Sequence, residues 1–70
     1  MKRREKVLEE AQKLVDDGRK PSARVISRKL DWPENDIHRC LNSLEKKGEI
    51  ETYTRSFRGD KHRFIGIKRG

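Results

Sequence analysis

Side chains that can bind a polyanion recur at regular spacing between residues 35 and 46. They are Asn35, His38, Arg39, Asn42 and Lys46, each three or four positions from the next or adjacent to it. In a helix of 3.6 residues per turn, this spacing places side chains on one face. Arginine can bind guanine or phosphate, and asparagine can pair with adenine or hold a phosphate. The segment therefore predicts a helix whose exposed face contacts nucleic acid.

A second group of basic side chains surrounds a glycine-containing turn near the end of the sequence. Its members are Arg55, Arg58, Lys61 and Arg63. A basic loop of this kind can follow a phosphate backbone or enter a minor groove. Phe57 lies in the same turn, where its ring could contact a base or a sugar, or pack back on the body. Arg24 and Arg28 form a third basic pair, off the apolar face of a shorter helix.

Acidic residues near the start of the helix oppose contact between that end and phosphates. Asp31, Glu34 and Asp36 lie there within six positions. Carboxylates also stabilise the positive end of a helix dipole, and we prefer this explanation of their position.

Catalytic and metal-binding signals are weak. His38, Cys40 and His62 do not have zinc-site spacing, and Cys40 lies on the apolar stripe of its helix. The sequence has no Ser/His/Asp grouping and no glycine-rich phosphate loop. We therefore expect no enzyme activity, no cofactor and no metal.

Positive charge is unevenly distributed along the 70 residues, whose net charge is +7. Residues 18–30 hold five basic and no acidic side chains, and residues 51–70 hold six basic and two acidic ones. A purely solubilising surface is the alternative, but the asymmetry favours a polyanionic partner. No apolar run reaches membrane-spanning length, and the single cysteine suits a reducing compartment. We expect a cytoplasmic protein, nucleoid-associated or nuclear, with no membrane partner.

The hydrophobic periodicity predicts one α+β domain over residues 1–70, with three helices followed by a β-hairpin. The expected ranges are about 4–17, 22–30 and 33–47 for the helices and about 49–68 for the hairpin. Ser22 should cap the second helix, and Pro33 should occupy the first turn of the third. Within the hairpin, we expect strands at 49–55 and 61–68, joined by a turn at 56–60.

The chain resembles the winged helix-turn-helix superfamily over nearly its whole length, and within it residues 29–50 resemble the Zα domains that bind left-handed nucleic acid. The shared features are Lys29-Leu30, Pro33, Ile37, Arg39, Leu41, Ser43-Leu44 and Lys46-Lys47-Gly48. Many of them are also found in small MarR-like regulators. The recognition asparagine and tyrosine of the Zα family correspond here to His38 and Asn42, and the prolines of its wing are missing. Only Arg39, and in the wing Phe64, match.

The resemblance and the charge together imply a winged helix that binds double-stranded DNA and regulates transcription or replication. Z-form binding of the Zα type is one alternative. A protein-interaction module and a ribosomal or other RNA-binding winged helix are two more. The sequence offers no extra helix for a stable dimer, so we expect a monomer or a dimer formed only on DNA.

Overall fold

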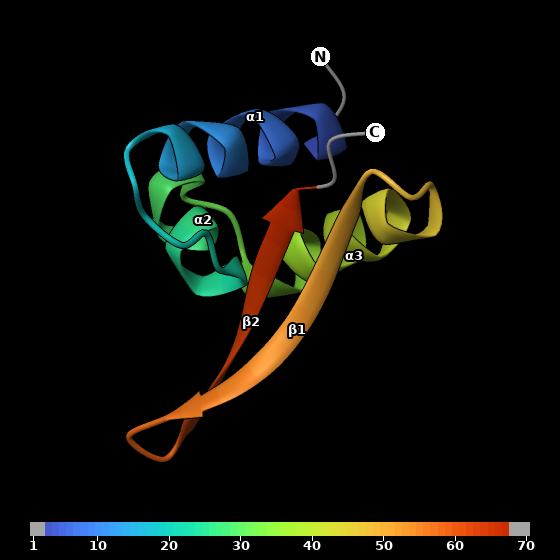
Figure 1. Cartoon of the computed structure of the whole chain (residues 1–70). Helices are drawn as coiled ribbons and strands as arrows, with labels where there is room; N and C mark the ends of the chain where they lie inside the picture. The colour runs from blue at the N-terminus through green and yellow to red at the C-terminus, as the bar shows by residue number, and fades with distance from the viewer. Residues whose placement is uncertain (1–2, 68–70) are drawn as a thin grey trace.

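A computed structural model describes residues 3–67 as three helices followed by an antiparallel hairpin. The elements are α1 (Arg3–Asp16), α2 (Ala23–Leu30), α3 (Glu34–Lys46), β1 (Ile50–Phe57) and β2 (Asp60–Ile67). The helices gather at one end, and the tip of the hairpin projects beyond them (Figure 1). This confirms the expected α+β arrangement, and the order of elements is compatible with a winged helix-turn-helix topology.

The first helix ends and the second begins within one residue of the predicted boundaries, at Asp16 and Ala23. Gly18 has a φ of 77°, and the amide of Arg19 donates to the carbonyl of Leu14 over 2.8 Å. Such a left-handed glycine satisfies carbonyls at a helix C-terminus. Ser22 caps α2 because its hydroxyl accepts from the amide of Val25 over 3.2 Å. The predicted capping role of Ser22 is therefore confirmed.

The turn between α2 and α3 is short and closed by backbone hydrogen bonds. Asp31 adopts a left-handed φ of 55°, and the amide of Trp32 donates to the carbonyl of Ser27 over 3.1 Å. Pro33 is the N-cap residue of α3, with ψ at 142°. The prediction that it lies in the first turn was therefore wrong by one position, because its backbone is still extended. Its carbonyl accepts from the amide of Asp36 over 3.0 Å.

One apolar core lies between the three helices and the base of the hairpin. Its most buried large side chains are Val7, Leu14, Ile26, Ile37, Leu41 and Ile50. Leu8, Val25, Leu30, Trp32 and Ile67 pack against it. Each helix therefore contributes an apolar stripe to the core, and the stripe of α3 fixes which of its faces stays exposed.

The hairpin turn is tighter than expected. Phe57 pairs with Asp60, so only Arg58 and Gly59 lie in the loop, with φ values of 51° and 83°. Two positive φ values are typical of a type I′ turn, whose twist matches that of the strands. Ser56, Phe57 and Asp60 thus belong to strands, and the predicted turn at 56–60 was wrong. The predicted end at Lys68 falls outside the described residues.

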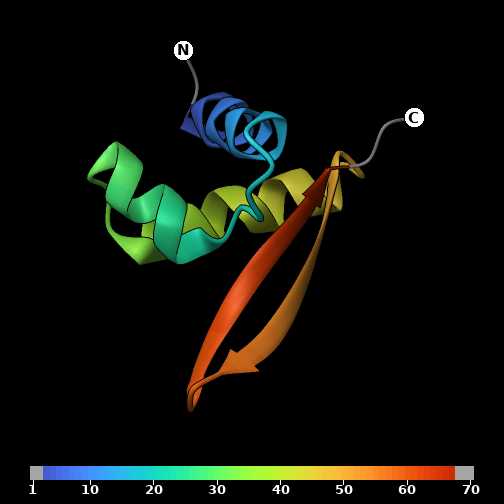
Figure 2. The same cartoon turned by 60° about the vertical axis from the view of Figure 1, so that its left-hand side comes forward.

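The base of the hairpin is tied to the link between α1 and α2. The amide of Ile65 donates to the carbonyl of Pro21 over 3.0 Å, and Ser22 forms an isolated antiparallel bridge with Phe64. Figure 2 shows that link running to the base of the hairpin, while the tip extends away from the helices. Within residues 3–67, no helix has the length and apolar character needed to cross a membrane.

Candidate nucleic-acid interface

The hairpin has two faces of different chemistry, because residues opposite one another on paired strands project to the same side. One face carries Ile50, Ile65 and Ile67 at its base, followed by Arg63 and Lys61 toward the tip. The other face carries Tyr53 opposite Phe64, and their rings stack with centroids 5.6 Å apart. The first face turns toward α3, and the second faces away from it.

A groove of about 200 Å³ lies where α2, α3 and the hairpin meet. The residues that line it are Ala23, Arg24, Glu34, His38, Thr54, Lys61, His62 and Arg63. Four predicted contact residues from three elements are thereby brought together, namely Arg24, His38, Lys61 and Arg63. Arg24, Lys61 and Arg63 carry three positive charges against the one carboxylate of Glu34, so the groove is net basic and suits a phosphate-bearing ligand.

Arg63 joins the hairpin to α3. Its Nη2 donates to Oδ1 of Asn42 over 2.8 Å, and its Nη1 lies 3.2 Å from Nδ1 of His38. Nη2 is also 3.6 Å from Oε1 of Glu45, and only 18% of the Arg63 side chain is exposed. These contacts place Arg63 inside the junction between β2 and α3. There it holds the side chains of α3 in position rather than extending into solvent.

Glu45 and Thr52 extend this junction and were missed by the sequence analysis. The carboxylate of Glu45 accepts from the Thr52 hydroxyl over 2.7 Å and from its amide over 3.1 Å. Helical spacing was a usable signal, because Glu45 follows Asn42 by three positions and shares its side of α3. The partner strand gave no such signal, since the contact depends on how the hairpin docks.

The exposed ridge of α3 consists of Asn35, Arg39, Asn42 and Lys46, all of which are exposed. They lie opposite the buried Ile37, Cys40, Leu41 and Leu44. His38 is half-buried on the flank nearest the hairpin, whereas Arg39 lines a hollow with Arg3 and Arg4 at the start of α1. The predicted face is therefore present, and Arg39 extends it toward α1.

The acidic groups at the start of α3 are paired with arginines from the other helices. Glu34 lies 3.5 Å from Arg24, and Asp36 lies 3.2 Å from Arg3. The Arg3 guanidinium also lies 5.7 Å from the centre of the Trp32 ring. These pairs offset the carboxylates that the sequence places near the candidate ligand surface.

The other predicted basic residues do not join the groove. Arg55 lies over Tyr53 on the outer face of the hairpin, at 5.4 Å from the ring centre. Arg58 lies in the loop, 5.5 Å from the ring of Phe57, which is 61% exposed. Arg28 is exposed in the last turn of α2. Of the predicted C-terminal basic cluster, Lys61 and Arg63 thus line the groove, whereas Arg55 lies on the outer face and Arg58 in the loop.

Cys40 is buried in the core beside α1. Burial raises the pKa of its thiol above the ordinary value of 9.0, and the nearby Arg3 and Arg4 oppose this shift only in part. Within residues 3–67, no group of three histidine, cysteine or acidic side chains is arranged to hold a metal ion.

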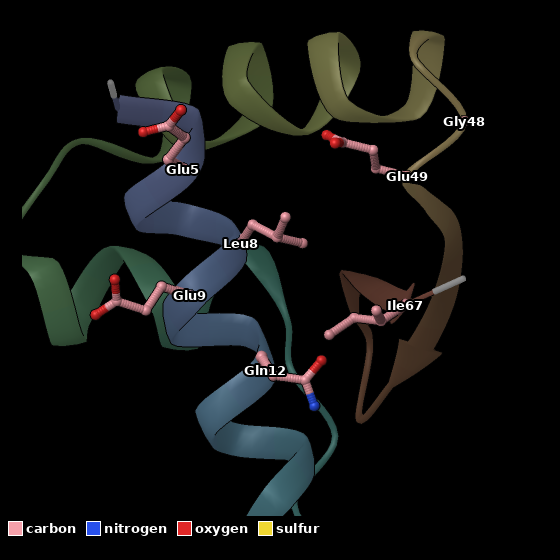
Figure 3. A pocket seen from close by; sticks show the side chains of 7 residues that line it. All are labelled: Glu5, Leu8, Glu9, Gln12, Gly48, Glu49 and Ile67. Atoms are coloured by element: carbon pink, nitrogen blue, oxygen red, sulfur yellow. The ribbon is translucent and has the colours of Figure 1, made fainter. Parts of the chain in front are cut away.

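A larger pocket, of about 530 Å³, lies between α1 and the end of β2. Leu8 and Ile67 point toward one another across it, and Glu5 and Glu49 lie along its rim (Figure 3). An apolar floor with acidic side chains around it does not suit a polyanion. The candidate interface is therefore the basic surface made by α2, α3 and the hairpin.

Comparisons of the chain with protein-family models, with curated proteins and with solved structures find no significant match.

Proposed function

We propose that this protein is a winged-helix domain that binds double-stranded DNA and acts as a regulator of transcription or replication. The observation that carries the proposal is the convergence of a basic groove, the exposed ridge of α3 and a projecting basic hairpin on one surface. An α-helix fits the major groove, and a neighbouring basic hairpin can follow the adjoining phosphates. The net charge of +7 favours the same ligand.

In this proposal each element has a distinct role. The ridge residues Asn35, Arg39, Asn42 and Lys46 face the base edges and flanking phosphates. Arg24 and Arg28 of α2, together with the tip of the hairpin, bind phosphates. The domain binds as a monomer or as a dimer that forms only on DNA.

A salt titration tests the proposal. We expect the protein to bind a short DNA duplex more tightly than a structured RNA of equal charge. The logarithm of the binding constant should fall linearly with the logarithm of salt concentration. The double variant Arg58→Ala/Lys61→Ala should flatten that slope by about 2, because each lost phosphate contact removes about 0.9.

Lys6→Ala/Lys13→Ala is the matched control, since it removes the same charge from α1, far from the hairpin tip. This control should leave the slope nearly unchanged. Equal slopes for the wild type and the hairpin variant would overturn the role of the hairpin. Tighter binding to RNA would identify RNA rather than DNA as the ligand. Absence of binding to both would refute the proposal.

A further inference from the structure

Arg63 determines which hydrogen-bonding atoms its neighbours on α3 present to a ligand. A guanidinium group can only donate hydrogen bonds, so His38 and Asn42 must both accept from it. Nδ1 of His38 therefore carries no proton when the ring is neutral, and the proton is on Nε2. Likewise, Oδ1 of Asn42 is engaged as an acceptor, at 2.8 Å from Arg63. The amide NH2 of Asn42 remains for an outside partner.

The rest of this surface also consists mainly of donors. Arg39 and Lys46 have no acceptor atoms. The flanking carboxylates already have partners, since Glu34 pairs with Arg24 and Glu45 accepts from Thr52. Asn35, at the N-terminal end of the ridge, is the residue that keeps an amide able to donate and accept. On the ridge, Arg39, Asn42 and Lys46 therefore offer donors, and the acceptors beside them, Glu45 and Oδ1 of Asn42, are already engaged.

Base edges in the major groove differ in what they offer to such a surface. Guanine presents two acceptors, N7 and O6, whereas adenine presents one acceptor and one donor, and cytosine presents a donor. An asparagine that reads adenine needs its oxygen as an acceptor, and here Arg63 already occupies one of the two lone pairs of that oxygen, which disfavours adenine. Donor side chains can therefore bind both guanine acceptors, N7 and O6.

We propose that Arg63 is a specificity-determining positioning residue, which makes the exposed face of α3 a donor surface that selects guanine-rich strands of duplex DNA. This inference rests on the proposed function and adds the class of sequence that the site prefers. Arg63 itself does not reach the base, because it lies within the junction between β2 and α3.

Selection from a pool of duplexes with a randomised centre tests the preference. We expect the wild type to enrich consecutive guanines on one strand. Replacing these guanines with adenine should weaken binding at least about tenfold. Substituting 7-deazaguanine, which lacks the N7 acceptor, should have a similar effect.

Arg63→Met tests the residue, and Arg58→Met is its matched control. Arg63→Met frees Nδ1 of His38 and Oδ1 of Asn42, so the guanine-to-adenine preference should fall by about threefold or more, with the donors of Arg39 and Lys46 retaining the rest. Arg58→Met removes the same charge at the hairpin tip, so it should weaken binding to every duplex alike and keep the preference. An undiminished preference in a folded Arg63→Met variant would overturn the inference.

Two further results separate this inference from the proposed function. A wild type that binds duplexes without favouring guanine would overturn the inference alone, because phosphate contacts would then carry the binding. A wild type that binds no duplex would overturn both.

The ring of His38 offers a test without any ligand, by long-range ¹H–¹⁵N correlation spectra in mildly alkaline buffer. A proton on Nε2 is expected, and a proton on Nδ1 would refute the inference.

Discussion

The guanidinium of Arg63 lies where most water is excluded, because only 18% of the side chain is exposed. A cation in such a place needs charged or strongly polar partners to offset its desolvation. Glu45, Asn42 and His38 supply them, and all three lie on the same side of α3. The angle between hairpin and helix therefore depends on polar contacts at the junction as well as on the apolar base.

Cys40 should be a poorly reactive thiol in the folded protein. Because burial raises its pKa, less thiolate is present at mildly alkaline pH, and the thiolate is the reactive form. Alkylation by iodoacetamide should be more than about tenfold slower than in concentrated guanidinium chloride. The raised pKa of the Cys40 thiol also affects the free energy of unfolding. The contribution of the buried thiol to that free energy is complete below about pH 9 and is lost as pH rises further. Equal alkylation rates in the two buffers would show that the thiol is exposed.

At the level of single residues, sequence patterns located contact candidates but not their mutual contacts. His38, Asn42 and Arg63 were each predicted as ligand contacts, and the structure brings them together. Sequence spacing relates His38 to Asn42, because both lie on one helix. It could not relate either to Arg63, because that contact depends on the hairpin register and on how β2 docks against α3.

Among the elements, α3 links the core to the proposed interface. Its buried stripe determines which way the ridge faces, so a change in its register would rotate every proposed contact. The hairpin depends on the same arrangement, because its base packs on the core and its middle contacts α3 through Arg63.

Leu41→Ala should destabilise the protein by about 2–5 kcal/mol, the range for removing a large buried aliphatic side chain. Leu41 is completely buried in the middle of α3. Thermal or denaturant unfolding followed by circular dichroism measures the loss. Asn35→Ala is a suitable control, because that side chain is exposed on the same helix and should change stability little. Unchanged unfolding of Leu41→Ala would mean that the buried stripe of α3 is wrongly assigned.

Helix boundaries were more predictable than the hairpin turn, for a physical reason. Gly18 and Ser22 act through local backbone conformation and local hydrogen bonds, which are properties of neighbouring residues. The turn was predicted as a five-residue loop because Ser56 to Asp60 is mostly polar. Strand pairing instead continues to Phe57, since Arg58 accepts a positive φ beside Gly59. A non-glycine residue in that conformation is uncommon and has no clear sequence signal.

For the whole molecule, size sets how much DNA one copy can cover. The described residues have a radius of gyration of 11.2 Å and a longest dimension of 33 Å. A compact domain of this length is expected near 11 Å. At about 3.4 Å per base pair, the longest dimension corresponds to about ten base pairs.

Binding to duplexes of increasing length tests this footprint. If one copy binds along its longest dimension, affinity should rise steeply up to about ten base pairs and then level off. Stoichiometry should then be one protein per duplex of that length. A steep cooperative rise near twice this length would instead indicate that a pair of copies forms the binding unit.

Arg58, at the hairpin tip, has a left-handed backbone conformation that lowers the stability of the hairpin while its charge serves the proposed binding. At the first position of a type I′ loop, asparagine or glycine is favoured, and a longer side chain is strained there by about 1 kcal/mol. Arg58 occupies that position with a φ of 51°. If the tip binds phosphates as proposed, selection for binding favours a charge where folding favours asparagine. The most thermostable version of this hairpin would then be a weaker binder than the natural sequence.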